Sequence, residues 1–173
     1  MLNGEEETKI ITVKNGGKKG EWTQTEHCPQ GTKARGFSLK VESQAFLSDD
    51  TALNGIILHC TRDGMDEDSV VSSGQGRWGA NTGTNWCTDG YLVAFSLRVE
   101  TSSYTFDETA ANNIRFKCNN GKYLEGKGMS WGNYSQWSPE CEEGICGIQT
   151  KIEKEQGMFG DDTALNDVRF YCC

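Results

Sequence analysis

Three short acidic strings recur along the chain and carry residue types that could do chemistry on a sugar. They read DDTALN at 49–54, DETAAN at 107–112 and DDTALN at 161–166. Cleavage of a glycosidic bond uses two carboxyl groups about 5–10 Å apart, which makes Asp49, Asp107 and Asp161 candidate catalytic acids. The competing role is turn formation, because Asp and Asn before a strand accept backbone N–H bonds. We favour the turn, since a threefold scaffold needs three copies of a motif and an active centre does not.

Tryptophan and glutamate side chains form a second set of candidates, for binding carbohydrate. An exposed indole packs against the C–H face of a pyranose ring, and a carboxylate accepts hydrogen bonds from sugar hydroxyls. The candidates are Trp22, Trp78, Trp131, Trp137, Glu42, Glu100 and Glu153. In the competing interpretation, which we favour, the indoles close the ends of the fold and the glutamates are solvated strand ends.

Other chemical motifs are missing from the sequence. It contains no nucleophile elbow, phosphate-binding glycine loop or Cys-x-x-Cys pair, so no cofactor is expected and zinc is disfavoured. The two histidines, His27 and His59, are expected as isolated surface side chains. Asn133-Tyr134-Ser135 matches the N-glycosylation sequon and is expected in a surface loop.

Size and charge limit the classes of partner. The chain has 173 residues, enough for one domain with its own core, and a net charge of −8. A polyanion needs a basic stripe on its partner, so nucleic acid and anionic membranes are not expected. No apolar stretch approaches the roughly 18 residues that span a bilayer, and we expect a monomer.

Eight cysteines in so small a chain indicate disulfides and an oxidising, extracellular compartment. Three pairs, one in each copy, are separated by almost equal lengths of chain: Cys28 and Cys60, Cys87 and Cys118, Cys141 and Cys172. Cys146 and Cys173 remain for a fourth bridge, although the adjacent thiols of Cys172 and Cys173 could exchange partners. The acidic start has no apolar leader, which predicts a mature chain with a loose tail over residues 1–8.

Each acidic string separates two segments in which apolar and polar residues alternate, the pattern of a half-buried strand. The segments are 37–42, 95–100 and 148–153 before the strings, and 56–60, 114–118 and 168–172 after them. About 55 residues per copy hold roughly four strands, hence one antiparallel sheet. Three such sheets, each apolar on one face, would form a single domain over 9–173, with copies near 9–62, 63–120 and 121–173. A β-trefoil is the competing threefold fold, and no helix is predicted.

These repeated strings resemble the vitelline membrane outer layer protein I family over nearly the whole chain. The resemblance is carried by GFSLKVE (36–42), DDTALNGIILHC (49–60), YLVAFSLRVE (91–100), TAANNIRFKC (109–118), WG (131–132) and GDDTALNDVRFYCC (160–173). It implies an all-β fold, the type I β-prism of three Greek-key antiparallel sheets with pseudo-threefold symmetry. It also implies a secreted protein like that of the outer layer of the avian egg coat. A transferase-type activity on N-acetylglucosamine oligosaccharides has been associated with the family.

Two functions follow as hypotheses. We favour a secreted, disulfide-stabilised structural protein that binds glycans or extracellular glycoproteins in a coat or secretion, without catalysis. The reasons are the tripled architecture, the many cysteines and the lack of a recognisable catalytic constellation. The alternative is a glycosyltransferase- or hydrolase-like enzyme acting on N-acetylglucosamine oligosaccharides, with Asp49, Asp107 and Asp161 taking part.

Overall fold

The computed structural model describes residues 8–42, 53–62, 67–76, 79–101, 109–154 and 163–173. The candidate acids Asp49, Asp107 and Asp161 lie outside this part, as do Trp78 and residues 1–7 of the predicted tail. Over the described residues the chain forms fourteen β-strands and no helix, in agreement with the alternating segments.

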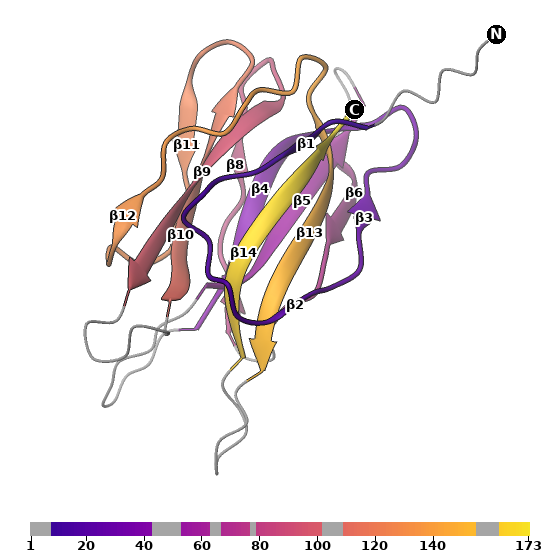
Figure 1. Ribbon diagram of the computed structural model, residues 1–173. Helices are drawn as coiled ribbons and strands as arrows, with labels where there is room; N and C mark the ends of the chain where they lie inside the picture. The colour runs from indigo at the N-terminus through magenta and orange to yellow at the C-terminus, as the bar shows by residue number, and fades with distance from the viewer. Residues whose placement is uncertain (1–7, 43–52, 63–66, 77–78, 102–108, 155–162) are drawn as a thin grey trace, which may run out of the picture.

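The strands form three antiparallel sheets (Figure 1). Sheet I contains β4 (Lys33–Val41), β5 (Leu53–Thr61), β6 (Glu67–Ser72), β7 (Ala80–Asn81) and β8 (Asn85–Trp86). Sheet II contains β9 (Leu92–Thr101), β10 (Thr109–Cys118), β11 (Tyr123–Glu125) and β12 (Asn133–Tyr134). Sheet III contains β13 (Ile145–Lys154), β14 (Thr163–Cys172), β1 (Ile10–Ile11), β2 (Glu21–Trp22) and β3 (Glu26–His27).

Each sheet has two long strands at its centre. Five of the six segments predicted from the alternation lie within these strands, and 37–42 extends one residue past the end of β4. The strand order is β6-β5-β4-β7 in sheet I and β11-β10-β9-β12 in sheet II. A meander whose next strand returns to lie beside the first is a Greek key. The returning strands, here called crossover strands, are β7 and β8 in sheet I, β12 in sheet II, and β2 and β3 in sheet III. The predicted three-sheet architecture is therefore confirmed, and the competing trefoil is excluded.

The prediction of one sheet per sequence copy is wrong. The N-terminal strands β1, β2 and β3 precede β4 in the chain, yet they pair with β14 and β13 of sheet III. Strands β6 to β8 follow the first copy but complete sheet I, and β11 and β12 follow the second copy but complete sheet II. Each sheet therefore takes strands from two copies, and the N-terminal segment closes the ring beside the C-terminus (Figure 1).

One apolar core lies between the three sheets. Four fully buried aromatic rings meet at its centre: Phe37, Phe95, Phe116 and Phe170. The ring centroids are 4.6 Å apart for Phe37 and Phe116, and 4.7 Å apart for Phe95 and Phe170. Burial of one such side chain stabilises a fold by about 1.5–3 kcal/mol, so the prism depends on contacts between sheets rather than on any single sheet.

The outward faces of the sheets carry polar residues, as expected, but they are partly covered by other side chains. Ser38 and Ser96 lie on these faces and are buried. His59, expected as an isolated surface side chain, is only 8% exposed and forms a 2.8 Å hydrogen bond with Ser38. Aromatic side chains from the crossover strands supply the cover, as where the Trp86 ring lies 5.4 Å from the His59 ring.

The four disulfides join the pairs that the spacing predicts: Cys28–Cys60, Cys87–Cys118, Cys141–Cys172 and Cys146–Cys173. The structure also settles the choice between the adjacent thiols of Cys172 and Cys173.

Three of these bridges connect neighbouring sheets, whereas the sequence predicted a bridge within each sheet. Cys28 follows β3 of sheet III, and its partner Cys60 lies in β5 of sheet I. The N–H of Cys87 donates a hydrogen bond to β4 of sheet I, whereas its disulfide partner Cys118 lies in β10 of sheet II. The N–H of Cys141 donates a hydrogen bond to β9 of sheet II, whereas its disulfide partner Cys172 lies in β14 of sheet III. The three bridges therefore run once around the prism.

Candidate functional site

Three loops with the sequence Cys-x-x-Gly meet at the end of the prism where the C-terminus lies (Figure 1). They span 28–31, 87–90 and 141–144, and each precedes the first long strand of a sheet. Gly31 and Gly144 have φ angles of 86° and 99°, a backbone that side chains disfavour. Each loop begins at a cysteine that is bonded to the neighbouring sheet. We call this region the cysteine-loop end.

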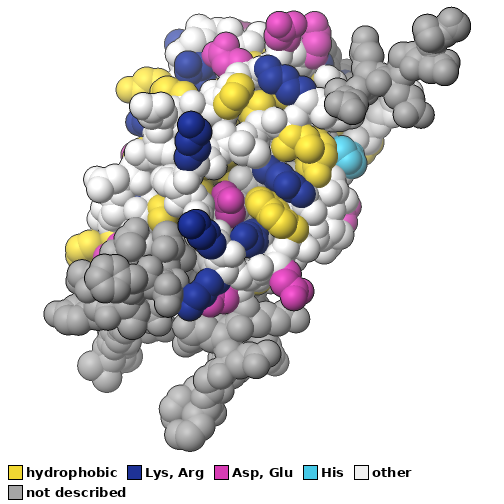
Figure 2. Space-filling model, in the orientation of Figure 1, with side chains coloured by type: hydrophobic (Ala, Val, Ile, Leu, Met, Phe, Trp, Pro, Cys, Tyr) yellow, Lys and Arg dark blue, Asp and Glu magenta, His cyan; other side chains and the backbone are white. Residues whose placement is uncertain are grey.

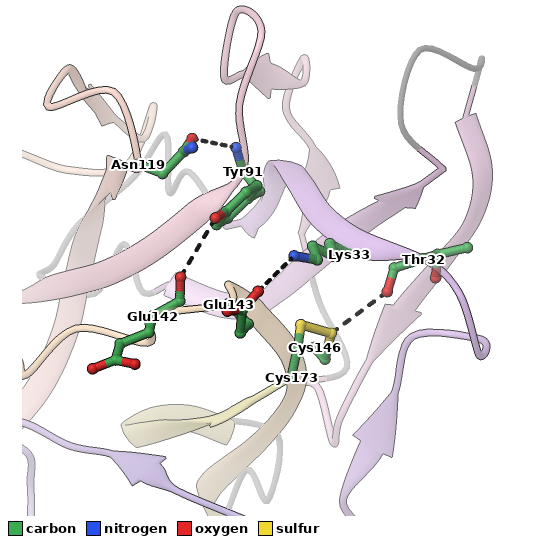
Figure 3. Close-up of polar contacts among 8 residues, drawn as sticks. All are labelled: Thr32, Lys33, Tyr91, Asn119, Glu142, Glu143, Cys146 and Cys173. Carbon is green, nitrogen blue, oxygen red and sulfur yellow. Dashed lines mark hydrogen bonds and ion pairs between the residues drawn. A yellow bond between two sulfur atoms is a disulfide. The ribbon is translucent and has the colours of Figure 1, made fainter.

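Tyr91 follows the second loop and connects it to the third (Figure 3). Its backbone N–H donates to Asn119 Oδ1 at 2.9 Å, and its hydroxyl donates to the Glu142 carbonyl at 3.4 Å. A Cβ atom on Gly144 would lie 2.8 Å from Tyr91 Cδ2. The glycine is therefore needed for the ring to pack against the loop of sheet III.

Two cations from β4 approach the Tyr91 ring from sheet I. Lys33 Nζ lies 4.3 Å from the ring centroid and Arg35 Cζ lies 5.8 Å from it, both within cation–π range. Lys33 also pairs with Glu143 at 3.7 Å, as Figure 3 shows. Arg35 Nη1 donates to the Gly90 carbonyl at 3.3 Å. All three sheets thus contribute to the surroundings of this tyrosine.

An open hollow of about 430 Å³ lies beside Tyr91. Its lining consists of Gly31, Lys33, Arg35, Asp89, Gly90, Tyr91 and Asn119. The exposed Asp89 has a φ angle of 56°, in the left-handed region that few residues other than glycine adopt. Backbone conformations of this kind concentrate at functional sites, and the volume falls within the range of about 300–1,000 Å³ usual for ligand pockets.

The chemistry of this lining favours reversible binding of a polar ligand. Asp89 offers a carboxylate acceptor, Asn119 offers an amide, and Lys33 and Arg35 offer cationic donors beside the tyrosine ring. Hydroxyl groups on a sugar match such a mixture of donors and acceptors. Glycosidic cleavage would use a second carboxyl group, and Asp89 is the one carboxylate among the described lining residues.

The enzymatic alternative stays a prediction. Its candidate acids, Asp49, Asp107 and Asp161, lie outside the described residues.

Two of the predicted carbohydrate-binding tryptophans lie on outward sheet faces beneath arginines. Arg169 Cζ is 4.2 Å from the Trp22 ring centroid on sheet III, and Arg115 Cζ is 4.6 Å from the Trp137 ring centroid on sheet II. Both indoles are half-buried, and the expectation that they close the ends of the prism is wrong. Figure 2 shows Lys, Arg and hydrophobic side chains interleaved over the face formed by β13 and β14.

Trp131 is the most exposed of the predicted tryptophans that the structure describes, at 60% exposure. Its carbonyl accepts a hydrogen bond from the Asn112 amide at 2.9 Å, and in the same way the Lys19 carbonyl accepts one from Asn166 at 2.8 Å. These asparagines end two of the acidic strings. They lie within β10 and β14 and hold the start of a crossover strand by donating to its carbonyls, a role that differs from the predicted turn formation.

The three predicted glutamates lie far from the hollow. Glu42 and Glu153 accept hydrogen bonds from Asn54 and Asn166 at 3.4 and 3.0 Å, and Glu100 is exposed. All three stand at the opposite ends of the long strands from the cysteine loops, about 30 Å away at 3.3 Å per residue.

Asn133 of the sequon is exposed. It lies on strand β12, paired with Val99, instead of in the expected loop.

The described ranges contain neither a metal-ligand cluster nor a membrane-spanning helix. No group of three or more His, Cys, Asp or Glu side chains there is arranged to hold a metal ion. No helix in these ranges is long and apolar enough to cross a membrane.

The residues around the hollow were missed by the sequence reasoning. The signal available was the Cys-x-x-Gly pattern at 28–31, 87–90 and 141–144, which marks three equivalent loops. Their other side chains differ between copies, so a search for repeated residues passes over Lys33, Asp89 and Tyr91. Equivalent loops at one end of a threefold fold must lie close together, and that geometric argument would have found the site.

Comparison with known proteins places the chain among relatives. The family model of vitelline membrane outer layer protein I matches residues 9–173. A vitelline membrane outer layer protein 1 homolog from Homo sapiens is 53% identical over 169 residues, covering 96% of this chain and 83% of the relative. The homolog from Mus musculus is 51% identical over 167 residues, covering 95% and 83%.

Solved structures with a similar fold are lectins. Frutapin, a lectin from Artocarpus incisa, has a TM-score of 0.59 at 16% identity, with 96% of this chain and 97% of that chain covered. A mannose-specific jacalin-related lectin from Morus nigra in complex with mannose has a TM-score of 0.59 at 14% identity, with 99% and 97% covered. At these identities the likeness establishes the fold, the β-prism of jacalin-related lectins.

Proposed function

Because this chain belongs to the vitelline membrane outer layer protein I family, we propose that it is a secreted structural protein that binds glycans of an extracellular coat or secretion. The glycan occupies the hollow beside Tyr91. The observation that carries this proposal is the convergence of the first two cysteine loops, β4 and Asn119 on one open, polar hollow beside an aromatic side chain.

The hollow has the groups that a neutral sugar needs. A sugar hydroxyl donates to the Asp89 carboxylate, and the Asn119 amide or Lys33 donates to another sugar oxygen. Hydrogen bonds to a charged group are worth about 1.5–3 kcal/mol each, enough for a weak, specific site. Artocarpin with mannotriose and the Morus nigra lectin with mannose share the fold, which makes mannose oligosaccharides the first probes.

The proposed extracellular location rests on the cysteines. All eight are paired in four disulfides, and such bonds form and persist in oxidising compartments. We expect a monomer of 19.1 kDa with four intact disulfides in the medium of secreting cells. Mass spectrometry and light scattering on that medium test this, and a reduced protein retained inside the cells would contradict it.

Replacement of Asp89 or Tyr91 by Ala tests the hollow. On a glycan array and by calorimetry with the sugars that the wild type binds, each variant should lose at least about tenfold in affinity, because a charged hydrogen-bonding group or the aromatic wall is removed. Tyr123→Ala is the matched control, since Tyr123 is 65% exposed and does not line the hollow. Wild-type protein that binds no glycan, or Asp89→Ala and Tyr91→Ala proteins that bind as the wild type does, would refute the proposal.

A further inference from the structure

The outward face of sheet II carries cationic and aromatic side chains in alternation. Arg98 Cζ and Arg115 Cζ lie 5.3 and 4.4 Å from the Tyr134 ring centroid. Arg115 also lies 4.6 Å from the Trp137 ring centroid, and Lys117 Nζ lies 5.2 Å from the same ring. We call these five residues the sheet II cation face. The rings hold the guanidinium groups in place, so little side-chain freedom is left to lose when a ligand binds.

Most of the positive charge of this face has no close carboxylate. Among the described residues, no carboxylate oxygen lies within 4.0 Å of Arg98 or Arg115, and Lys117 pairs with Glu140 at 3.6 Å. Arg98 Nε donates to the Gly132 carbonyl at 3.1 Å, whereas the buried Arg115 Nε has no hydrogen-bond partner. A buried donor without a partner is costly, and the contacts of the Arg115 guanidinium with the Tyr134 and Trp137 rings offset part of that cost.

Two acidic groups border the face. Glu140 is the partner of Lys117, and Glu125 interacts with the Tyr134 hydroxyl. Burial, together with Glu125, raises the pKa of Tyr134 well above its usual range, so the phenol stays neutral beside the two arginines. Arg98 and Arg115 therefore keep a local positive charge on a protein whose net charge is −8.

The three sheets differ at these positions, so the threefold scaffold does not require the arrangement. In sheet III, Trp22 lies between Lys151 and Arg169, but Asp167 pairs across the strands with Lys151 and reduces the positive charge. In sheet II the residue across from Arg98 is the neutral Asn113. In sheet I the corresponding positions hold Lys40, Asn81 and Ile57, with one cation and no ring. Sheet II therefore combines two arginines with a neutral residue opposite Arg98, although Glu125 of β11 lies opposite Arg115.

We propose that the sheet II cation face binds a sulfate or carboxylate group carried on a glycan chain. This rests on the proposed glycan-binding function for the class of ligand, but it uses a surface separate from the hollow beside Tyr91. The planar forks of Arg98 and Arg115 donate in pairs to the oxygens of such a group. The half-buried Trp137 provides an apolar surface for the adjoining sugar ring. An acidic glycan could in this way bridge several molecules in a matrix, with neutral sugars held at the cysteine-loop end.

A binding experiment with defined polysaccharides tests this inference. Fluorescently labelled chondroitin sulfate, hyaluronan and neutral dextran are titrated with full-length protein in low and physiological salt. We expect chondroitin sulfate to bind with an affinity that falls as salt rises, and any binding of neutral dextran to be insensitive to salt. Binding of hyaluronan as tight as that of chondroitin sulfate assigns the site to carboxylates, and much weaker binding assigns it to sulfates.

Charge-matched variants locate the site. Arg98→Gln with Arg115→Gln should weaken chondroitin sulfate binding at least about tenfold, because two charge-assisted contacts are lost. Lys18→Gln with Lys122→Gln removes the same charge from exposed positions outside this face and should change binding less than twofold. If the glutamine double variant fails to fold, Arg98→Lys with Arg115→Lys keeps the charge but removes both forks, and it should still weaken binding.

Three results would overturn the inference. They are a wild type that binds neither acidic polysaccharide, folded arginine variants that bind them as the wild type does, and preferential binding of single-stranded DNA. Tyr91→Ala separates the two proposals, since it should weaken binding of neutral sugars at least about tenfold and leave chondroitin sulfate binding intact.

Discussion

At the scale of single residues, Asp167 is a half-buried acid that has no acidic counterpart in the other two sheets. It lies across from Lys151 in sheet III, where sheet II has Asn113 and sheet I has Gly55. Burial raises the pKa of its carboxyl group from the usual 3.8 to about 6. The Val168 N–H, Lys151 and Arg169 act in the opposite direction and only partly offset the burial.

This pKa predicts how stability depends on pH. Because the folded-state pKa lies above the unfolded value, the protonated form is favoured by folding, and its contribution is complete below about pH 4. The contribution is lost as the pH rises through about 6, where the folded protein must hold a charged, half-buried carboxylate.

Asp167→Asn should therefore stabilise the protein above pH 6 and leave it unchanged at pH 3.5. Asn113 Oδ1 accepts the Ile114 N–H at 2.9 Å, as Asp167 Oδ1 accepts the Val168 N–H at 2.8 Å, so asparagine keeps the backbone contact. Allowing for solvent screening, we expect about 1 kcal/mol, or about 2–4 °C in Tm, at pH 7.5. Thermal unfolding from pH 3.5 to 8 measures this. Glu142→Gln controls for the change in net charge, and parallel profiles for wild type and Asp167→Asn would contradict the prediction.

At the scale of elements, the crossover strands are attached to their sheets through glycines. Gly20, Gly79 and Gly132 precede β2, β7 and β12, with φ angles of 100°, 125° and 86°. A Cβ atom on Gly20 would lie 2.6 Å from the Ile152 carbonyl oxygen, and one on Gly132 would meet the Val99 carbonyl oxygen. Both the backbone angle and the close approach to a long strand therefore require glycine.

Gly132→Ala should destabilise the protein by about 2–4 kcal/mol, because it adds a clash with backbone to the cost of a left-handed conformation. Gly121→Ala separates the two costs, since Gly121 has a φ angle of 90° but no atom within 4 Å of an added Cβ. The Gly121→Ala variant should lose only about 1 kcal/mol in its free energy of unfolding. Denaturant unfolding of both variants is the measurement, and equal losses would show that the crossover strand moves freely away from β9.

At the scale of the whole molecule, the disulfides determine how firmly the sheets are held together. Cys87–Cys118 closes 31 residues and joins sheets I and II. Cys146–Cys173 closes 27 residues, but Cys141–Cys172 already holds the same two segments together. With that bridge in place, the fourth bridge constrains only the few residues between the neighbouring cysteines.

Removal of the two bridges should therefore have unequal effects. From the entropy of loop closure, we expect Cys87→Ser with Cys118→Ser to lower the free energy of unfolding by about 3.7 kcal/mol. Cys146→Ser with Cys173→Ser should lower it by about 2.3 kcal/mol, because this bridge closes only a small loop. Guanidinium unfolding at neutral pH, with free-thiol counts to verify the remaining bridges, compares the variants. A larger loss from the second pair would show that the fourth bridge does more than tighten a small loop.

Much of the fold was predictable from residues close together in the chain. The alternation in 37–42 and 114–118, the three asparagine-ending strings and the cysteine spacing indicated long strands, three sheets and four disulfides. They did not indicate that β2 and β3 belong to sheet III, because the partner of a crossover strand depends on the path of the chain through space. The burial of His59 was missed for the same reason, since the ring that covers it comes from another strand.

The candidate site was the least predictable feature. Lys33, Tyr91, Asn119 and Glu143 share no motif, and they come together only because three disulfide-bonded loops end at one corner of the prism. The sequence by itself determined the six long strands and two of the disulfides, Cys28–Cys60 and Cys87–Cys118, since these follow from local periodicity and equal spacing. The tertiary structure alone decided which sheets the bridges join and which side chains surround the hollow. Closure of the ring brings the N-terminal strands to the C-terminal sheet, and no local pattern encodes that contact.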